Sequence, residues 1–447
     1  MMFRKFAAWP IAVVALLDVL DVTSEARAAE PITLTAKLAQ PVMTSGGNQT
    51  NYLRVGLNGC EPQPKANRTP VNVAFVIDRS GSMAGDRIAQ AREAAVMAIK
   101  RLNDDDIASV VIFDDRVEVP VPAQKVADQG YFIGRIRQIG VRGNTAIHDG
   151  VTAGAREVRK HKDARHLNRV VLLSDGQANV GPTLPADFAA LGRSLLAEGI
   201  SVSTIGLGVD YNEDLMLQLA RAADGNHAFA SAPTDLVQIF NREFDDVLAS
   251  CAQTVSIDVE LKPGVRAVRA LSRDGKIEDA HASFQLNQIY AATEHYVLME
   301  VAFDTTAPSD ERDVGVVHVA YTAPDTGVRQ TLDAPIRARF GASEQDVAAS
   351  ADKTVMESVI EQAARERAER AVTLRDQGRT DEARALLSQN AAEMRSYLSA
   401  NPASPLADLS MQYNGMLMML SKPSEWNEQR KVLRQMDSRG TKAGARY

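Results

Sequence analysis

Aromatic residues make up only 5% of the 447-residue sequence, whereas 45% of its residues are hydrophobic. The buried cores must therefore be built mainly from Val, Ile, Leu and Ala. The net charge of −7 is small for this length, which argues against a general nucleic-acid-binding protein. The length exceeds that of a single typical core, so we expect roughly two to four domains.

Patterns of common catalytic and zinc sites are also missing. The seven histidines show no HExxH or other zinc-ligand spacing. No serine lies in a GxSxG motif, and RGNTAIHDG at residues 142–150 is neither a GxGxxG nor a Walker loop. We therefore expect a protein that is not an enzyme, with a metal-assisted hydrolase as the less favoured alternative.

Long hydrophobic runs are missing after the first 20 residues, and none approaches the roughly 18 apolar residues that a membrane span needs. At the start of the chain, Arg4 and Lys5 precede an apolar run. Ala26-Arg27-Ala28 then has the small-x-small pattern of a signal peptidase site. Residues 1–28 are thus predicted to be a cleaved signal peptide, and an uncleaved anchor is the alternative. The mature chain is expected to be periplasmic or secreted.

The sequence has only two cysteines, Cys60 and Cys251. They lie just outside the two ends of one segment, residues 71–250, so a disulfide would clamp that segment at its base. Two buried free thiols are the alternative.

Residues 71–250 alternate between short apolar runs and amphipathic stretches. VNVAFVI at 71–77 and RVVLLS at 169–174 indicate buried strands, and DRIAQAREAAVMAIKRL at 86–102 indicates a helix. Continuous apolar strands that alternate with helices are typical of a parallel sheet covered on both faces. We predict an α/β doubly wound domain over residues 71–250.

The flanking segments have a different pattern. Residues 31–60 and 253–340 alternate between apolar and polar positions with a period of two, which indicates antiparallel sheet with one buried face. We predict one β-sandwich domain into which the α/β domain is inserted, and two separate β elements are the alternative. Residues 347–447 are predicted to be helical, with a helix pair broken at Gly378 and a basic tail that is either a docking tail or a solvated terminus.

Oxygen-bearing side chains gather at predicted strand ends and loops of the α/β domain. Asp78, Ser80 and Ser82 follow the first strand, Thr145 lies in the loop that enters a helix, and Asp175 follows another apolar strand. Ligands bind at the carboxyl edge of such sheets. An oxygen-only set suits Mg²⁺, Mn²⁺ or Ca²⁺ rather than zinc or copper. The alternative is a structural turn in which Asp and Ser cap the next helix.

The charges of this set favour binding of a partner. Two carboxylates just cancel the charge of a divalent cation, and the three hydroxyls add none. The cation would stay electrophilic, so a remaining position could accept an Asp or Glu carboxylate of a protein partner.

FVIDRSGSM at residues 75–83, together with Thr145 and the SDG at Asp175, resembles the metal-ion-dependent adhesion site of von Willebrand factor type A domains. The resemblance covers about residues 71–250 and implies the fold of that family. It also implies Ser80, Ser82 and Thr145 as direct metal ligands, with Asp78 and Asp175 binding directly or through water. The flanking strands resemble those of secreted bacterial members.

These observations predict an exported, metal-dependent binding protein of the adhesion type. The alternative is a scaffold subunit of a cell-envelope assembly in which the metal only stabilises the fold.

Overall fold

The chain divides into two compact units, residues 1–30 and residues 31–447. The predicted signal peptide at residues 1–28 lies outside the described residues. The computed structural model describes residues 32–61, 69–163, 165–208, 212–230, 250–304 and 309–420, together with isolated residues between 235 and 239 and between 422 and 443.

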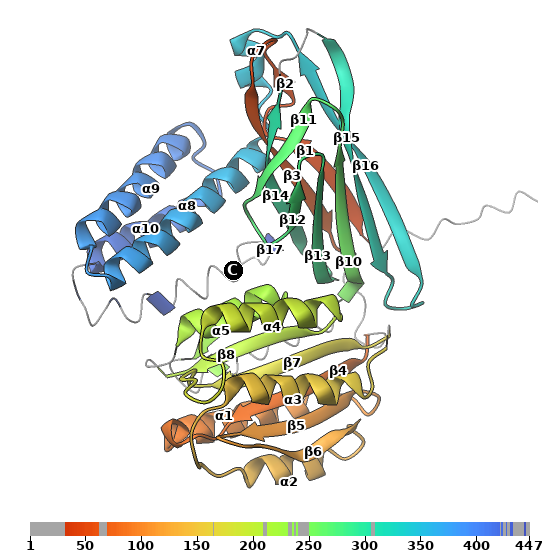
Figure 1. The fold of residues 1–447 in the computed structure, drawn as a ribbon, viewed down its shortest axis with the longest axis vertical. Helices are drawn as coiled ribbons and strands as arrows, with labels where there is room; N and C mark the ends of the chain where they lie inside the picture. The colour runs from red at the N-terminus through yellow and green to blue at the C-terminus, as the bar shows by residue number, and fades with distance from the viewer. Residues whose placement is uncertain are drawn as a thin grey trace, which may run out of the picture. The chain divides into compact units, whose positions relative to one another are not determined.

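A six-stranded sheet in the order β6-β5-β4-β7-β8-β9 forms the centre of the α/β domain (Figure 1). Neighbouring strands are parallel except at β6, which pairs antiparallel with β5. Apart from β6, the strands are buried throughout, as their continuous apolar sequences require. The strands are β4 (Val71–Asp78), β5 (Ile107–Phe113), β6 (Val117–Lys125), β7 (Leu167–Ser174), β8 (Ser201–Leu207) and β9 (His227–Ala230).

Helices cover both faces of this sheet. Successive residues of β4 point to opposite faces of the sheet. Phe75 packs in the hydrophobic core that includes α1 and α2, and Val76 packs in the core that includes α3, α4 and α5. The helices are α1 (Asp86–Ile99), α2 (Gln129–Arg137), α3 (Ile147–Arg159), α4 (Pro185–Ala197) and α5 (Glu213–Ala222).

The chain segments before and after the α/β domain together form a β-sandwich. One sheet has the order β1-β3-β14-β11 with β17 paired to β14, and the other has the order β12-β13-β10-β15-β16-β2. Side chains from both sheets share one hydrophobic core. The strands are β1 (Thr33–Leu38), β2 (Val42–Met43), β3 (Gln49–Asn58), β10 (Ser250–Leu261), β11 (Val265–Ala270), β12 (Lys276–Glu278), β13 (His281–Tyr290), β14 (Glu294–Phe303), β15 (Ser309–Thr322), β16 (Arg329–Phe340) and β17 (Lys442–Ala443).

Strands from before and after the α/β domain are neighbours in this sandwich. β3 pairs antiparallel with β14 along its whole length, from Asn58 opposite Glu294 to Gln49 opposite Phe303. The α/β domain is therefore inserted in the chain between β3 of one sheet and β10 of the other, within a single sandwich. The predicted fold class, a doubly wound sheet inserted in an antiparallel β-sandwich and followed by helices, is confirmed.

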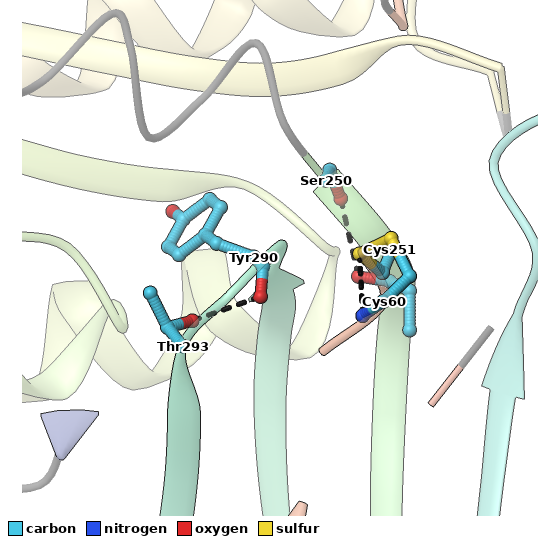
Figure 2. Close-up of a disulfide and its surroundings, with 6 residues drawn as sticks. Cys60, Ser250, Cys251, Tyr290 and Thr293 are labelled. Atoms are coloured by element: carbon cyan, nitrogen blue, oxygen red, sulfur yellow. Dashed lines mark hydrogen bonds between the residues drawn. A yellow bond between two sulfur atoms is a disulfide. The ribbon is translucent and has the colours of Figure 1, made fainter. Parts of the chain in front are cut away.

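The predicted disulfide between Cys60 and Cys251 is present and joins residues 191 positions apart (Figure 2). Cys60 follows β3, and Cys251 is the second residue of β10. The backbone N–H of Cys60 also donates to Sγ of Cys251 at 3.0 Å. The bond thus links the strand that leads into the α/β domain to the strand that follows it.

The C-terminal region is mainly helical over residues 344–419, and these helices pack on both other regions. Gly378, with φ +80°, lies between the two longest helices, as predicted for the break. Gln362 donates to the hydroxyl of Tyr296 in β14 at 2.7 Å, and Arg221 of α5 forms an ion pair with Glu369. Among the described residues, no helix is long and apolar enough to cross a membrane. The helices are α7 (Glu344–Ala349), α8 (Lys353–Asp376), α9 (Thr380–Ala400) and α10 (Leu406–Met419).

Buried polar contacts join the α/β domain to the end of β13. Arg169, near the start of β7, donates to the hydroxyl of Tyr290 at 2.7 Å and to Gln288 at 3.3 Å. Asp224, just after α5, accepts from the backbone N–H of Asn287 at 2.7 Å. Arg169 and Asp175 lie at opposite ends of β7, so the sandwich contacts the edge of the sheet remote from the predicted metal site.

Candidate metal centre

The loop that follows β4 carries three of the predicted ligands. Asp78 is the last residue of β4, and its Oδ1 accepts a hydrogen bond from the backbone N–H of Ser80 at 2.8 Å. The hydroxyl oxygens of Ser80 and Ser82 lie 3.1 Å apart. Asp78 and Ser80 are buried, whereas Ser82 is exposed. The loop therefore presents adjacent hydroxyls, one of them open to solvent, beside a buried carboxylate.

Backbone contacts bring the Thr145 loop against this first loop. The N–H of Gly81 donates to the carbonyl of Gly143 at 3.0 Å, and the N–H of Arg142 donates to the carbonyl of Arg79 at 2.7 Å. Thr145 itself is only 2% exposed. The loops after β4 and before α3 thus form one continuous surface.

The loop after β7 completes the arrangement. Ser174 donates from its hydroxyl to Oδ2 of Asp78 at 2.5 Å, which places Asp175 beside the first loop. Asn179 accepts the backbone N–H of Thr145 at 2.8 Å, and its own N–H donates to the Thr145 carbonyl at 3.1 Å. The structure therefore connects all three ligand-bearing loops predicted from the sequence.

The two carboxylates differ in how their oxygens are used. Both oxygens of Asp78 accept hydrogen bonds, from Ser80 and Ser174. The pKa of Asp78 is raised to about 6, mainly by burial and in addition by the nearby Asp175 carboxylate, even though these hydrogen bonds lower it. Asp175 is 1% exposed, and its Oδ1 has no hydrogen-bond partner among the residues that the structure describes. A buried bare carboxylate oxygen is costly unless a cation or a donor approaches it.

This donor set fits a divalent cation. It offers a bare carboxylate oxygen on Asp175, the neighbouring hydroxyls of Ser80 and Ser82, and a second carboxylate on Asp78, all hard oxygen donors. Within the described ranges, no cluster of three or more His, Cys, Asp or Glu side chains is placed to hold a metal. A metal at this edge would therefore depend on hydroxyl ligands as well as carboxylates.

Three residues that support the candidate site were not predicted from the sequence. Ser174 and Asn179 lie within five residues of Asp175, but their bonds to Asp78 and Thr145 depend on which loops meet in the fold. Arg87, in the first turn of α1, donates to Oδ2 of Asp175 at 3.2 Å. In the sequence it is one of several charged residues of an amphipathic helix, and nothing distinguished it.

A cluster of ion pairs anchors the loop after β4 and the loop before α3. Buried Asp114 accepts from Nε of Arg79 at 2.7 Å and from Nε of Arg142 at 3.1 Å. Arg79 also donates to Glu118 at 2.6 Å. These pairs keep the arginine of the Asp78–Ser82 loop directed at Asp114 and Glu118, and they tie Arg142 to the same anchor.

Comparison with known proteins identifies the family to which the α/β domain is similar. The family model of the von Willebrand factor type A domain matches residues 72–242. The uncharacterized protein sll0103 of Synechocystis is 26% identical over 307 residues, which cover 66% of this chain and 71% of that protein. The human inter-alpha-trypsin inhibitor heavy chain H3 is 28% identical over 36% of this chain, and the match spans only 19% of its own length.

Solved structures show the same fold over nearly the whole chain. A von Willebrand factor type A protein from Catenulispora acidiphila aligns with a TM-score of 0.72 at 17% identity, covering 94% of this chain and 99% of that one. The ArnB paralog VWA2 from Sulfolobus acidocaldarius aligns with a TM-score of 0.64 at 15% identity, covering 93% and 99%. Domains of this type commonly mediate protein–protein interactions and commonly bind a divalent metal. The α/β domain of this chain, over residues 72–242, is therefore a von Willebrand factor type A domain.

Proposed function

We propose that this is an exported binding protein whose von Willebrand factor type A domain holds a divalent cation, preferably Mg²⁺, and captures an acidic side chain of a partner protein through it. Ser80, Ser82 and Thr145 supply neutral hydroxyls, and Asp175 supplies a carboxylate. Asp78, whose oxygens both accept hydrogen bonds within the protein, acts through water or through its remaining lone pairs.

The bare Oδ1 of Asp175 is the observation that carries this proposal. It is a buried anionic acceptor among hydroxyls, with a second buried carboxylate nearby. A bound divalent cation would satisfy this oxygen and balance both carboxylates. The exposed hydroxyl of Ser82 marks the side from which a partner's carboxylate would approach.

The disulfide supports the proposed export. Disulfides such as the Cys60–Cys251 bond form and persist in oxidising compartments, for example the periplasm or the extracellular space. We therefore place the working protein in the periplasm or outside the cell.

We propose no catalytic step at this site. The side chains bonded to the ligand-bearing loops are serines, an asparagine and arginines paired with carboxylates, a set suited to holding a cation rather than to activating a nucleophile. Metal-assisted hydrolysis of generic phosphoester or peptide substrates, lost in Asp175→Ala, is the result that would favour an enzyme instead.

The test is a capture experiment from envelope extract with the purified protein, in Mg²⁺ and in EDTA. Ser80→Ala/Ser82→Ala removes two hydroxyl ligands, and Ser396→Ala/Ser399→Ala removes two exposed hydroxyls of α9 as the matched control. We expect a partner that is captured in Mg²⁺ by the wild type and the control, and lost with EDTA or the first double variant. Changing Asp and Glu of that partner to Asn and Gln, one at a time, should then identify the captured carboxylate.

Capture that is indifferent to chelator and to both double variants would contradict the adhesion function. It would place the interface elsewhere on the chain and favour the envelope scaffold.

A further inference from the structure

Arg87 connects two parts of the candidate metal centre. It is the second residue of α1, and its Nη1 donates to the backbone carbonyl of Ser82 at 3.2 Å and to Oδ2 of Asp175 at 3.2 Å. One guanidinium therefore contacts a ligand-bearing loop after β4 and the carboxylate after β7. No other cation is paired with Asp175 in the part of the chain that the structure describes.

The fold leaves room for this guanidinium. Gly208, which follows β8, has φ +79°, and a Cβ at that position would lie 2.8 Å from Nε of Arg87. A side chain there would push the guanidinium away from Asp175. Arg87 is partly exposed, with 28% of its side chain accessible, whereas that of Asp175 is 1% accessible. The arginine can therefore move into solvent, but the carboxylate cannot.

The charge of Arg87 affects how strongly a metal ion could bind at Asp175. Arg87 already neutralises the carboxylate that the proposed function assigns to the cation. A divalent ion at the bare Oδ1 of Asp175 would lie within a few ångströms of the Arg87 guanidinium, and like charges at such distances repel each other more strongly the less solvent lies between them. Metal binding would therefore have to displace the guanidinium or bind against its repulsion.

We propose that Arg87 is a built-in competitor of the metal, a positioning residue that neutralises Asp175 when the site is empty and lowers the affinity of the site for divalent cations. The inference rests on the proposed function. It predicts that the site fills and empties within a range of cation concentration set by Arg87, rather than holding its ion permanently.

A purely structural role predicts the opposite sign. If Arg87 served mainly to order the loop through the Ser82 carbonyl, its loss would loosen the ligands and weaken metal binding. If it competes, its loss strengthens metal binding while the metal-free protein becomes less stable, because buried Asp175 then lacks its counter-charge.

The experiment uses the purified protein, stripped of metal with EDTA and dialysed. Titration calorimetry with MnCl₂ and with MgCl₂ gives the metal affinity, and thermal unfolding in EDTA gives the metal-free Tm. The variants are Arg87→Gln, which removes the charge, and Arg87→Lys, which keeps it. Arg92→Gln is the matched control, because Arg92 also belongs to α1 but its guanidinium contacts the carbonyls of Arg137 and Ile139.

We expect Arg87→Gln to bind Mn²⁺ about tenfold more tightly than the wild type, equivalent to about 1.4 kcal/mol, and to have a lower Tm in EDTA. Arg87→Lys should lie near the wild type in affinity, and Arg92→Gln should match it.

An affinity in Arg87→Gln that is equal to or weaker than that of a metal-binding wild type would overturn the inference and leave the proposed function standing. Absence of metal binding in the wild type and in every variant would overturn both.

Discussion

The hydroxyl of Ser174 donates to Oδ2 of Asp78 at 2.5 Å and accepts the backbone N–H of Gly176 at 2.8 Å. One small side chain thus orients the carboxylate of the first loop and the turn that carries Asp175. Residues that orient metal ligands in this way typically change metal affinity by 10–100-fold when they are removed.

We therefore expect Ser174→Ala to weaken Mn²⁺ binding by about tenfold or more while the protein still folds. The control is Ser109→Ala, another buried serine of the same sheet, in β5. Calorimetric titration of both variants checks the prediction, and equal affinities would show that the Ser174 hydroxyl does not support the site.

Removal of the charge at Asp175 should uncouple stability from the metal. For the wild type, we expect Tm to rise in Mg²⁺ relative to EDTA, because a ligand that binds only the native state stabilises it by mass action. In Asp175→Asn this rise should disappear. The Tm of the variant in EDTA should stay near that of the wild type, because the change removes the buried charge itself and the arginine that loses its partner, Arg87, is partly exposed to solvent.

Asp274→Asn is the control for this change, since 83% of the Asp274 side chain is exposed. It should keep the full rise in Tm. A Mg²⁺-dependent rise that survives in Asp175→Asn would place the ion somewhere else.

Loss of the Cys60–Cys251 bond should destabilise the protein strongly. The bond closes a loop of 191 residues, for which chain entropy gives an upper limit of about 5 kcal/mol. Cys60→Ser/Cys251→Ser should therefore unfold at clearly lower guanidinium concentration than the oxidised wild type. Reduced wild type should behave like the double variant. If intact-mass measurement found two free thiols in the native protein, the clamp would be disproved.

The ion pair between Glu213 of α5 and Lys431 should stabilise the contact between the α/β domain and the C-terminal region. Both side chains are 2% exposed, with Nζ and Oε2 3.0 Å apart. Glu213→Gln removes the carboxylate that pairs with the buried ammonium of Lys431 and also with Arg430, so we expect a loss of about 3 kcal/mol in the free energy of unfolding. Because the two groups are coupled, Glu213→Gln/Lys431→Met should cost less than the two single changes added together.

Glu369→Gln is the comparison for this pair. The Arg221–Glu369 pair also joins α5 to the C-terminal region, but 40% and 34% of its side chains are exposed, so the change should cost less than about 1 kcal/mol. Denaturant unfolding measures all four variants. Strict additivity of Glu213→Gln and Lys431→Met would show that the buried contact contributes no coupling.

The sequence predicted the α/β sheet because its central strands are buried on both faces. Strands such as β4 and β7 need apolar residues at every position, and that pattern is visible without any structure. The edge strand β6 was not predicted. It contains Pro120 and Pro122 and is only partly buried, so it lacks the continuous pattern, and edge positions tolerate proline because some of their N–H groups need no partner.

Only those residues of the candidate site that lie at strand ends or in recognisable loops could be predicted from the sequence. Asp78 is the last residue of one apolar strand, and Asp175 directly follows another. Both therefore lie at the same edge of the parallel sheet. Ser174 and Arg87 act through contacts between segments 88 to 96 residues apart in the chain, and no local pattern records such contacts. Residues that tune a site are therefore harder to find in one sequence than residues that line it.

The insertion of the α/β domain also determines how a mechanical force would pass through the molecule. A pull on the metal centre reaches the sandwich through two chain segments, one after β3 and one before β10, and the Cys60–Cys251 bond ties these segments together covalently. Tension on the inserted domain is therefore shared between two ends that the disulfide holds together, so that neither β3 nor β10 carries the load alone. A domain joined to its neighbour by a single linker would carry the same tension through one chain segment alone.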